Sequence, residues 1–154
     1  MIIADTSGLL AAFGVDADKY RQARTAYEDD PGPVVLSPFV LAELDYMLLT
    51  RAGVKAELQL LQEVAEGVFE LASFNRADAG QAAAVAERYA DMRIGLADAS
   101  IVVLAARYQT TRLLTFDERH FRAIKPLHAE AFTILPADRE LRRPVATKPR
   151  SLHY

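Results

Sequence analysis

The residues of this chain best suited to chemistry are four acids that a parallel α/β fold could bring together: Asp5, Glu43, Asp98 and Asp117. Hard divalent cations such as Mg²⁺ take several oxygen ligands, and carboxylates supply them when they converge on one crevice. The first acid ends the short apolar run 1–4, and the last follows the apolar run 112–116. Both are therefore expected at the carboxyl ends of strands, which is where open α/β sheets form their ligand crevice.

The third acid, Asp98, lies in segment 97–106, which as a helix is apolar almost all the way round. A carboxylate in such surroundings is costly unless it is paired or bound to a metal. Helix capping is the alternative for Asp98, and equally for Asp5 and Asp117, because each stands close to the start of a predicted helix. Independent capping explains the acids less economically than one shared metal site does.

The second acid belongs to a predicted helix over residues 38–51, which begins with a proline and carries both Glu43 and Asp45. The apolar stripe of this helix centres on Val40, Leu44, Met47 and Leu48. By helical angle, the two acids flank that stripe almost symmetrically. Periodicity therefore leaves open which of the two faces the crevice.

Composition narrows the chemistry further. The chain has no cysteine, which excludes thiolate zinc sites, disulfides and cysteine nucleophiles, and its histidines show no metal-ligand spacing: His120, His128 and His153. The net charge is −3 and is unevenly distributed. Residues 137–154 contain five Lys/Arg and two Asp/Glu, whereas residues 1–136 contain thirteen Lys/Arg and nineteen Asp/Glu. Nucleic-acid binders are usually basic, so such a substrate requires that metal ions neutralise the acids.

Short apolar runs alternate with longer helical patterns along the chain. Strands are predicted at residues 1–4, 34–36, 68–74, 112–116 and 131–135, and helices at 17–28, 38–51, 55–66, 77–92 and 97–108. This alternation predicts one α/β domain over residues 1–136, with a mostly parallel sheet of four to five strands covered on both faces. Residues 137–154 are expected to form a basic, loosely ordered tail.

No uninterrupted apolar run reaches the roughly 18 residues that a membrane span needs. The first residues also lack the basic start and long apolar core of a secretory signal. A cytoplasmic protein is therefore expected.

Four short motifs follow one another along residues 1–135: Ile3-Ala4-Asp5-Thr6-Ser7, Ala42-Glu43-Leu44, Gly95-Leu96-Ala97-Asp98-Ala99-Ser100 and Leu114-Thr115-Phe116-Asp117. In this order and spacing the chain resembles the PIN-domain family, and within it the VapC-type toxins of bacterial toxin–antitoxin pairs. The resemblance implies a PIN-like three-layer α/β/α sandwich. It also implies a metal-dependent endoribonuclease that uses Mg²⁺ or Mn²⁺.

The resemblance also assigns roles to single residues. It makes the catalytic set Asp5, Glu43, Asp98 and Asp117, and so selects Glu43 over Asp45. Direct metal contacts fall to Asp5, Asp98 and Asp117, with Asp5 and Asp98 as the strongest candidates, while Glu43 or Asp117 is expected to orient or deprotonate the attacking water. Thr6 is expected as a supporting residue near the metal. Asp91 lies outside the set matched to the family and is expected only as a supporting group in the outer surroundings of the metal. Basic residues at the crevice rim, expected to bind RNA phosphates, are Arg93 and Arg119, with Arg142 and Arg143 in the tail.

The partners implied are an RNA substrate, a VapB-like antitoxin and a second copy of the chain in a homodimer. An apolar groove for the antitoxin is expected at residues 9–13 together with the helix over 38–49, because exposed apolar surface usually marks an interface. Clustered acids are also expected to raise one another's pKa values.

Other protein classes fit less well. A phosphoacceptor signalling domain would need an adjacent acidic pair after the first strand and an Asp directly after the strand at 68–74, and neither is present. A haloacid-dehalogenase-type phosphatase would need an Asp where Ser7 stands. A catalytically silent PIN-like scaffold is the remaining alternative, although such a protein would have little reason to keep all four acids.

Overall fold

A parallel five-stranded sheet in the order β3-β2-β1-β4-β5 organises the computed structural model, which describes residues 1–139. The strands are β1 (Ile2–Ala4), β2 (Val34–Leu36), β3 (Glu70–Leu71), β4 (Arg112–Leu114) and β5 (Thr133–Leu135). Every neighbouring pair is parallel. All five strands lie within the runs predicted from the sequence, so both the number and the direction of the strands are confirmed.

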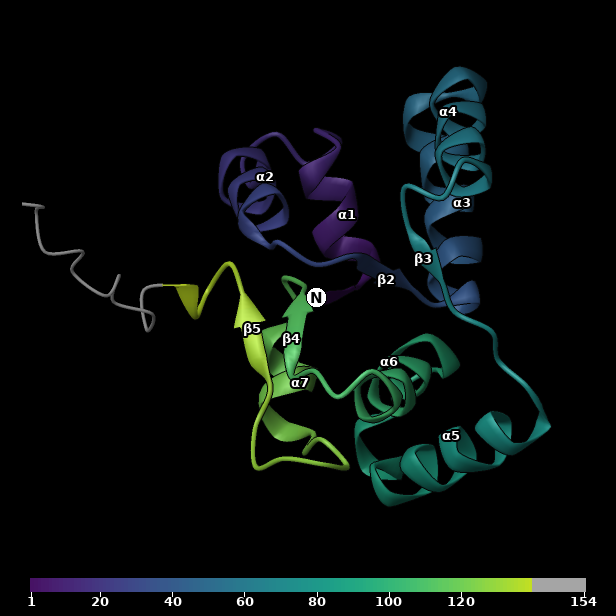
Figure 1. Cartoon of the computed structure of the whole chain (residues 1–154), viewed down its shortest axis with the longest axis vertical. Coiled ribbons are helices and arrows are strands. Elements are labelled where there is room, and N and C mark those ends of the chain that lie inside the picture. Colours follow the sequence, from purple (N-terminus) through teal and green to yellow (C-terminus); the bar gives the residue numbers. More distant parts are fainter. Residues whose placement is uncertain (140–154) are drawn as a thin grey trace, which may run out of the picture.

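Helices cover both faces of the sheet, as Figure 1 shows. On one side lie α1 (Thr6–Ala12) and α2 (Tyr20–Asp29), and on the other lie α5 (Arg76–Arg88) and α6 (Leu96–Arg107). The hairpin of α3 (Pro38–Ala52) and α4 (Val54–Ala65) stands at the β3 edge, and the short α7 (Glu118–Ala123) connects β4 to β5. This is the expected three-layer α/β/α arrangement.

The direction of winding reverses between β1 and β4. From β1 the chain continues to β2 and β3 on one side, whereas from β4 it continues to β5 on the other. The carboxyl ends of these two central strands therefore flank the switch point, where open α/β sheets bind ligands. The backbone N–H of Asp5 donates to the Leu114 carbonyl oxygen at 3.0 Å, so the two strand ends are joined there.

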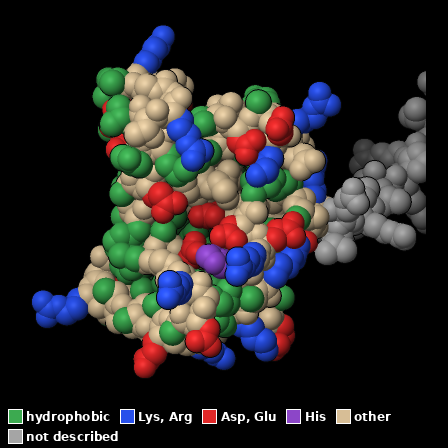
Figure 2. Space-filling view, turned by 180° about the vertical axis from the view of Figure 1, so that it is seen from behind, with side chains coloured by type: hydrophobic (Ala, Val, Ile, Leu, Met, Phe, Trp, Pro, Cys, Tyr) green, Lys and Arg blue, Asp and Glu red, His purple; other side chains and the backbone are tan. Residues whose placement is uncertain are grey.

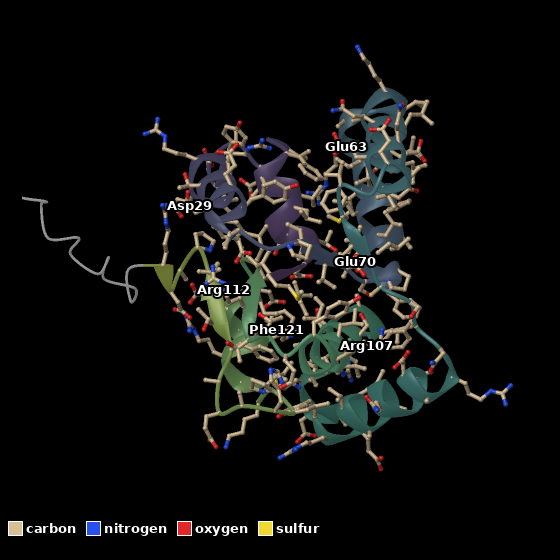
Figure 3. All side chains as sticks on the ribbon, viewed as in Figure 1. Asp29, Glu63, Glu70, Arg107, Arg112 and Phe121 are labelled. Carbon is tan, nitrogen blue, oxygen red and sulfur yellow. The ribbon has the colours of Figure 1, made fainter. Side chains whose placement is uncertain are left out.

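The core explains why β1, β4 and α6 have continuous apolar sequences. Ile3 and Leu114 are fully buried in the central strands, which are covered on both faces. All seven residues from Ala99 to Ala105 of α6 are buried because this helix lies between the sheet and α5. Arg107, labelled in Figure 3, reaches from α6 to α5, where it pairs with Asp78 at 2.5 Å. These contacts fix the helix that carries Asp98.

Two sequence predictions are corrected by the structure. The helix expected over 77–92 ends at Arg88, and a 3₁₀ turn follows at Ala90–Met92, because Arg93 adopts a left-handed conformation (φ 52°) where the chain turns into α6. The groove expected at residues 9–13 together with the helix over 38–49 is confirmed only in part: Phe13 and Leu48 line a cleft, but Leu9 does not. Leu9 and Leu48 are buried in the core, since α1 packs against α3.

The end of the domain is tied to its body as far as the structure describes it. The Asp138 carboxylate accepts two hydrogen bonds from the Arg122 guanidinium, and Arg139 pairs with Asp29 of α2. Residues 140–154, which hold most of the predicted tail, lie outside the described residues. Within residues 1–139, no helix combines the length and apolar character needed to cross a membrane.

Gly8 lets α1 approach the end of β4. A Cβ atom at this position would lie 2.2 Å from the Leu114 carbonyl oxygen and 2.6 Å from its carbon, far inside van der Waals contact. The clash would be with backbone at the centre of the sheet, which cannot move aside cheaply. Glycine is therefore required three residues after Asp5 for α1 to start where it does.

We expect Gly8→Ala to destabilise the fold by about 2 kcal/mol or more, because the added methyl group overlaps the β4 backbone. The matched control is Gly80→Ala in α5, where a Cβ meets nothing within 4 Å. That change should stabilise the protein by about 0.5–1 kcal/mol through helix propensity. Urea unfolding of the two variants measures both effects, and equal behaviour would contradict the close approach at Gly8.

Candidate active site

A cleft of ≈ 380 Å³ opens at the carboxyl edge of the sheet, beside the switch point between β1 and β4. Its lining includes all four predicted acids, Asp5, Glu43, Asp98 and Asp117. Figure 2 shows acidic side chains gathered around a histidine on this face of the molecule. The remaining lining residues are Thr6, Ser7, Leu10, Asp16, Met47, Arg51, Gly95 and Ala97. Residues far apart in the sequence thus meet where the topology places a ligand site.

Asp5 is the most deeply buried acid of the cleft, with only 7% of its surface exposed. Its Oδ1 accepts a hydrogen bond from the Thr6 N–H at 2.8 Å, so Asp5 does cap α1. Its Oδ2 accepts a second hydrogen bond from the Thr115 hydroxyl at 2.7 Å. Capping and a place in the cleft are therefore compatible, because the two carboxylate oxygens have different partners.

Two hydroxyl groups that sequence reasoning did not single out hold Asp5 in place. The Ser7 Oγ accepts the Phe116 N–H at 3.0 Å, and the Thr115 Oγ1 accepts the Asp117 N–H at 3.0 Å. The two hydroxyl oxygens lie 3.3 Å apart. They join the start of α1 to the loop after β4, and so fix Asp117 relative to Asp5. Both hydroxyls stand inside the motifs that suggested the family, but only the fold reveals that they meet.

Thr6, predicted as a helper, also lines the cleft. Its hydroxyl oxygen is buried and has no hydrogen-bond partner among residues 1–139. A buried hydroxyl without a partner is unusual and costs free energy unless a ligand satisfies it. This position agrees with the expected supporting role.

On the opposite wall, Asp98 and Asp117 share a histidine. The His120 Nδ1 lies 2.9 Å from Asp98 Oδ2 and 3.1 Å from Asp117 Oδ2. Asp117 also caps α7 by accepting the His120 backbone N–H at 3.2 Å. Spacing among the histidines alone gave no sign of this role for His120. The available signal was the Asp-x-x-His spacing at a helix start, which brings the third helical residue back to its cap.

The packing of α3 places Glu43 and Asp45 in different surroundings. Glu43 is exposed and lines the cleft. Asp45 faces Glu57 of α4. The pKa of Glu57 is raised first by partial desolvation and then by the hydrogen bond with Asp45 and the charge of Asp45. The start of α3 is fixed by a 2.7 Å hydrogen bond between the buried hydroxyls of Ser37 and Ser100, which connects it to α6. Of the two acids that periodicity could not separate, the structure brings Glu43 to the cleft.

The remaining sequence-predicted site residues lie elsewhere. Asp91, Arg93 and Arg119 are exposed and are not part of the cleft lining. The predicted outer-shell place of Asp91 is thus not supported by its position. Arg51, at the far end of α3, is instead the arginine that lines the cleft. Helical spacing explains its place, because residues 43, 47 and 51 of one helix share a face.

The surroundings of the cleft disfavour the charged forms of two of its carboxylates. The pKa of Asp5 is raised to about 6, mainly by burial and in addition by the neighbouring Asp98 and Glu43, against the hydrogen bonds from Thr115 and Thr6. Desolvation also raises the pKa of Asp98, although the hydrogen bond with His120 opposes the shift. These directions agree with the rise expected among clustered acids. Converging carboxylate oxygens that lack a counter-charge are a donor set that fits a hard divalent cation.

Comparisons with known proteins agree with this geometry. A family model described as PIN domain matches residues 2–126. Ribonuclease VapC26 of Mycobacterium tuberculosis is 45% identical over 135 residues, which cover 88% of this chain and 100% of that protein. The crystal structure of Mycobacterium tuberculosis VapC20, a sarcin-ricin loop cleaving toxin, has a TM-score of 0.74. That likeness covers 84% of this chain and 99% of VapC20 at 20% identity, and therefore concerns the fold alone.

We expect Asp5→Asn to stabilise the metal-free protein at pH 7 by about 1–3 kcal/mol, because it removes a buried charge. An acid whose pKa is raised by folding contributes stability below its unfolded pKa of 3.8 and loses it as pH rises through about 6. The advantage of the variant should therefore shrink from pH 7 towards pH 4.

The measurement is thermal or urea unfolding in EDTA across this pH range. Asp91→Asn is the matched control, because it removes the same charge from an exposed position outside the cleft. If Asp5→Asn were no more stable than this control at pH 7, the electrostatic cost assigned to the Asp5 carboxylate would be refuted.

Proposed function

The chain belongs to the PIN-domain family, and from that premise we propose that it is an endoribonuclease which hydrolyses RNA with Mg²⁺ or Mn²⁺ held by its acidic cleft. The observation that carries the proposal is the convergence of Asp5, Glu43, Asp98 and Asp117 beside the switch point of the sheet. The nearly complete overlap with a relative named as a ribonuclease supports it. Its biological role is then that of a VapC-type toxin, acting in the cytoplasm.

In this mechanism Asp5, Asp98 and Asp117 would hold the cation. When bound, such an ion lowers the pKa of water and stabilises charge on the phosphate. Glu43 stands at the exposed mouth of the cleft, where it can orient the attacking water and take its proton. Thr115 keeps Asp5 in position through the hydrogen bond described above, and the Ser7 hydroxyl donates a second, longer one to Asp5 Oδ2 at 3.4 Å. The protein needs no covalent nucleophile for this reaction.

The RNA backbone passes Arg51 as it enters the cleft. Arg51 lies eight residues beyond Glu43 on α3, which is about 12 Å along the helix. It therefore contacts a phosphate other than the one being cleaved. The choice of RNA over DNA rests on the relative VapC26, which is named a ribonuclease. Arg93 and Arg119 are proposed to contact the phosphates of longer RNA substrates that extend beyond the cleft.

An antitoxin of the VapB kind is the proposed inhibitor. A second cleft of ≈ 280 Å³ lies between α1, α2, α3 and α4, and its apolar lining includes Phe13, Val15 and Leu60. An amphipathic helix suits such a groove. A homodimer is the proposed assembly, and exposed apolar side chains on α3 and α4 are available to it: Tyr46, Leu49, Val54, Leu58 and Leu61.

The central prediction concerns cleavage of total RNA in the presence of Mn²⁺. Asp5→Asn, Asp98→Asn and Glu43→Gln should each reduce the rate by about 10²-fold or more, because each removes a cation ligand or the proton acceptor. Asp45→Asn is the matched control on the same helix and should cleave normally, since Asp45 faces α4.

Folding of each variant is checked by circular dichroism before the rates are compared. If Glu43→Gln and Asp45→Asn reduced the cleavage rate equally, the role of Glu43 as the proton acceptor would be contradicted. A wild-type protein without cleavage under any divalent ion would favour the silent-scaffold alternative.

A separate prediction concerns RNA binding. Arg51→Ala should weaken binding of a short RNA and reduce the slope of log affinity against log salt by about 1, as expected for one lost phosphate contact. Arg76→Ala, which removes an exposed arginine at the start of α5 outside the cleft lining, is the control. The measurement is fluorescence anisotropy at several salt concentrations with Glu43→Gln as the background. An unchanged slope in Arg51→Ala would remove Arg51 from the RNA path.

A further inference from the structure

The cleft contains a nitrogen atom that the proposed mechanism does not use. The His120 Nδ1 and one carboxylate oxygen each from Asp98 and Asp117 all lie within 4.8 Å of one another. These three atoms come from two elements, α6 and the first turn of α7 with its cap. Among the residues that the structure describes, this is the one group of three or more such side chains close enough to hold a single metal ion.

The imidazole of His120 is held firmly in this place. Its backbone N–H donates to the Asp117 carboxylate at 3.2 Å, which fixes the first turn of α7. The next residue, Phe121, is 1% exposed and packs edge-on against Phe132, with ring centroids 6.0 Å apart. The His120 side chain itself is 25% exposed, so the ring is open to solvent on one side. The backbone that carries the ring is thus fixed by the core beneath α7, and the ring lies against the two carboxylates.

The spacing of the three atoms suits a shared cation. Adjacent ligands of an octahedral ion with bonds of 2.0–2.1 Å stand about 2.8–3.0 Å apart. The nitrogen lies 2.9 Å from Asp98 Oδ2 and 3.1 Å from Asp117 Oδ2. Little movement is needed to turn these contacts into edges of a coordination shell. The nitrogen then offers its lone pair, and the ring proton resides on Nε2.

We propose that His120 is a direct nitrogen ligand of the catalytic cation, and that the cleft consequently selects a first-row transition ion such as Mn²⁺ over Mg²⁺. This inference rests on the metal-dependent function proposed above and deepens it. Mg²⁺ binds almost entirely through oxygen and keeps several waters, whereas imidazole nitrogen is a good ligand for transition ions. A neutral nitrogen also adds a ligand without adding another negative charge to a crowded group of acids.

The test is pulsed electron paramagnetic resonance of Mn²⁺ bound to the full chain, because directly coordinated nitrogen modulates the electron spin echo. The wild-type protein should show nitrogen modulation, and ¹⁵N-histidine labelling should shift its frequency. His120→Gln should abolish the modulation, whereas His128→Gln should retain it, because the His128 ring nitrogens have no hydrogen-bond partner, and so contact no acid, among residues 1–139. The labelling experiment uses wild-type protein only, and so does not depend on a variant that folds.

Affinity supplies a second readout. Mn²⁺ should bind wild-type protein at least about tenfold more tightly than Mg²⁺ in calorimetry, and His120→Gln should narrow this ratio by weakening Mn²⁺ more than Mg²⁺. An outer hydrogen-bonding role for His120 would weaken both ions alike and give no nitrogen modulation.

The outcomes separate this inference from the proposed function. Mn²⁺ bound with histidine nitrogen modulation that is lost in His120→Gln supports the inference. Mn²⁺ bound without such modulation overturns it and leaves the acidic metal site intact. A chain that binds neither Mn²⁺ nor Mg²⁺ at millimolar concentration overturns both.

Discussion

The buried carboxylate of Asp5 is the constraint on which the rest of the site depends. It lies where β1 meets β4, and a charge there is costly unless hydrogen bonds or a cation compensate it. The fold provides the Thr6 N–H and the Thr115 hydroxyl as donors, and Gly8 allows α1 to start close enough for both. The pKa of Asp5 stays raised nonetheless. A cation bound as proposed above would therefore offset a cost to stability that the metal-free protein carries.

Helix capping and a place in the cleft, which the sequence offered as alternative roles for the acids, are compatible in this fold. Asp5 and Asp117 each follow a central strand and precede a helix, so each caps that helix with one oxygen. The other oxygen is left near the cleft, in contact with Thr115 or His120. A parallel α/β sheet produces this arrangement wherever an acid ends a strand at the switch point. Asp98 differs, because Gly95 caps α6 and the carboxylate is free for another role.

The sequence predicted what depends on local patterns and failed where packing between elements decides. Strands β1 and β4 were recognisable because burial on both faces demands continuous apolar residues. The choice between Glu43 and Asp45 required the position of α4, which no periodicity in α3 contains. The place of His120 depends on Asp98, 22 residues away on another helix. Leu9 was wrongly expected at the surface, because an amphipathic pattern does not say that α1 is covered by α3.

The proposed function also resolves the conflict between an acidic protein and an anionic substrate. Without a cation, the carboxylates of the cleft repel a phosphate, and Arg51 is the arginine in its lining that attracts one. Under the proposed function, a bound divalent ion places positive charge beside the scissile phosphate and offsets part of the negative charge of the acids. Cation and RNA must therefore bind cooperatively, and by linkage each increases the affinity of the other. A net charge of −3 is consistent with this coupling, because the attraction for RNA resides in the loaded cleft and not in the surface as a whole.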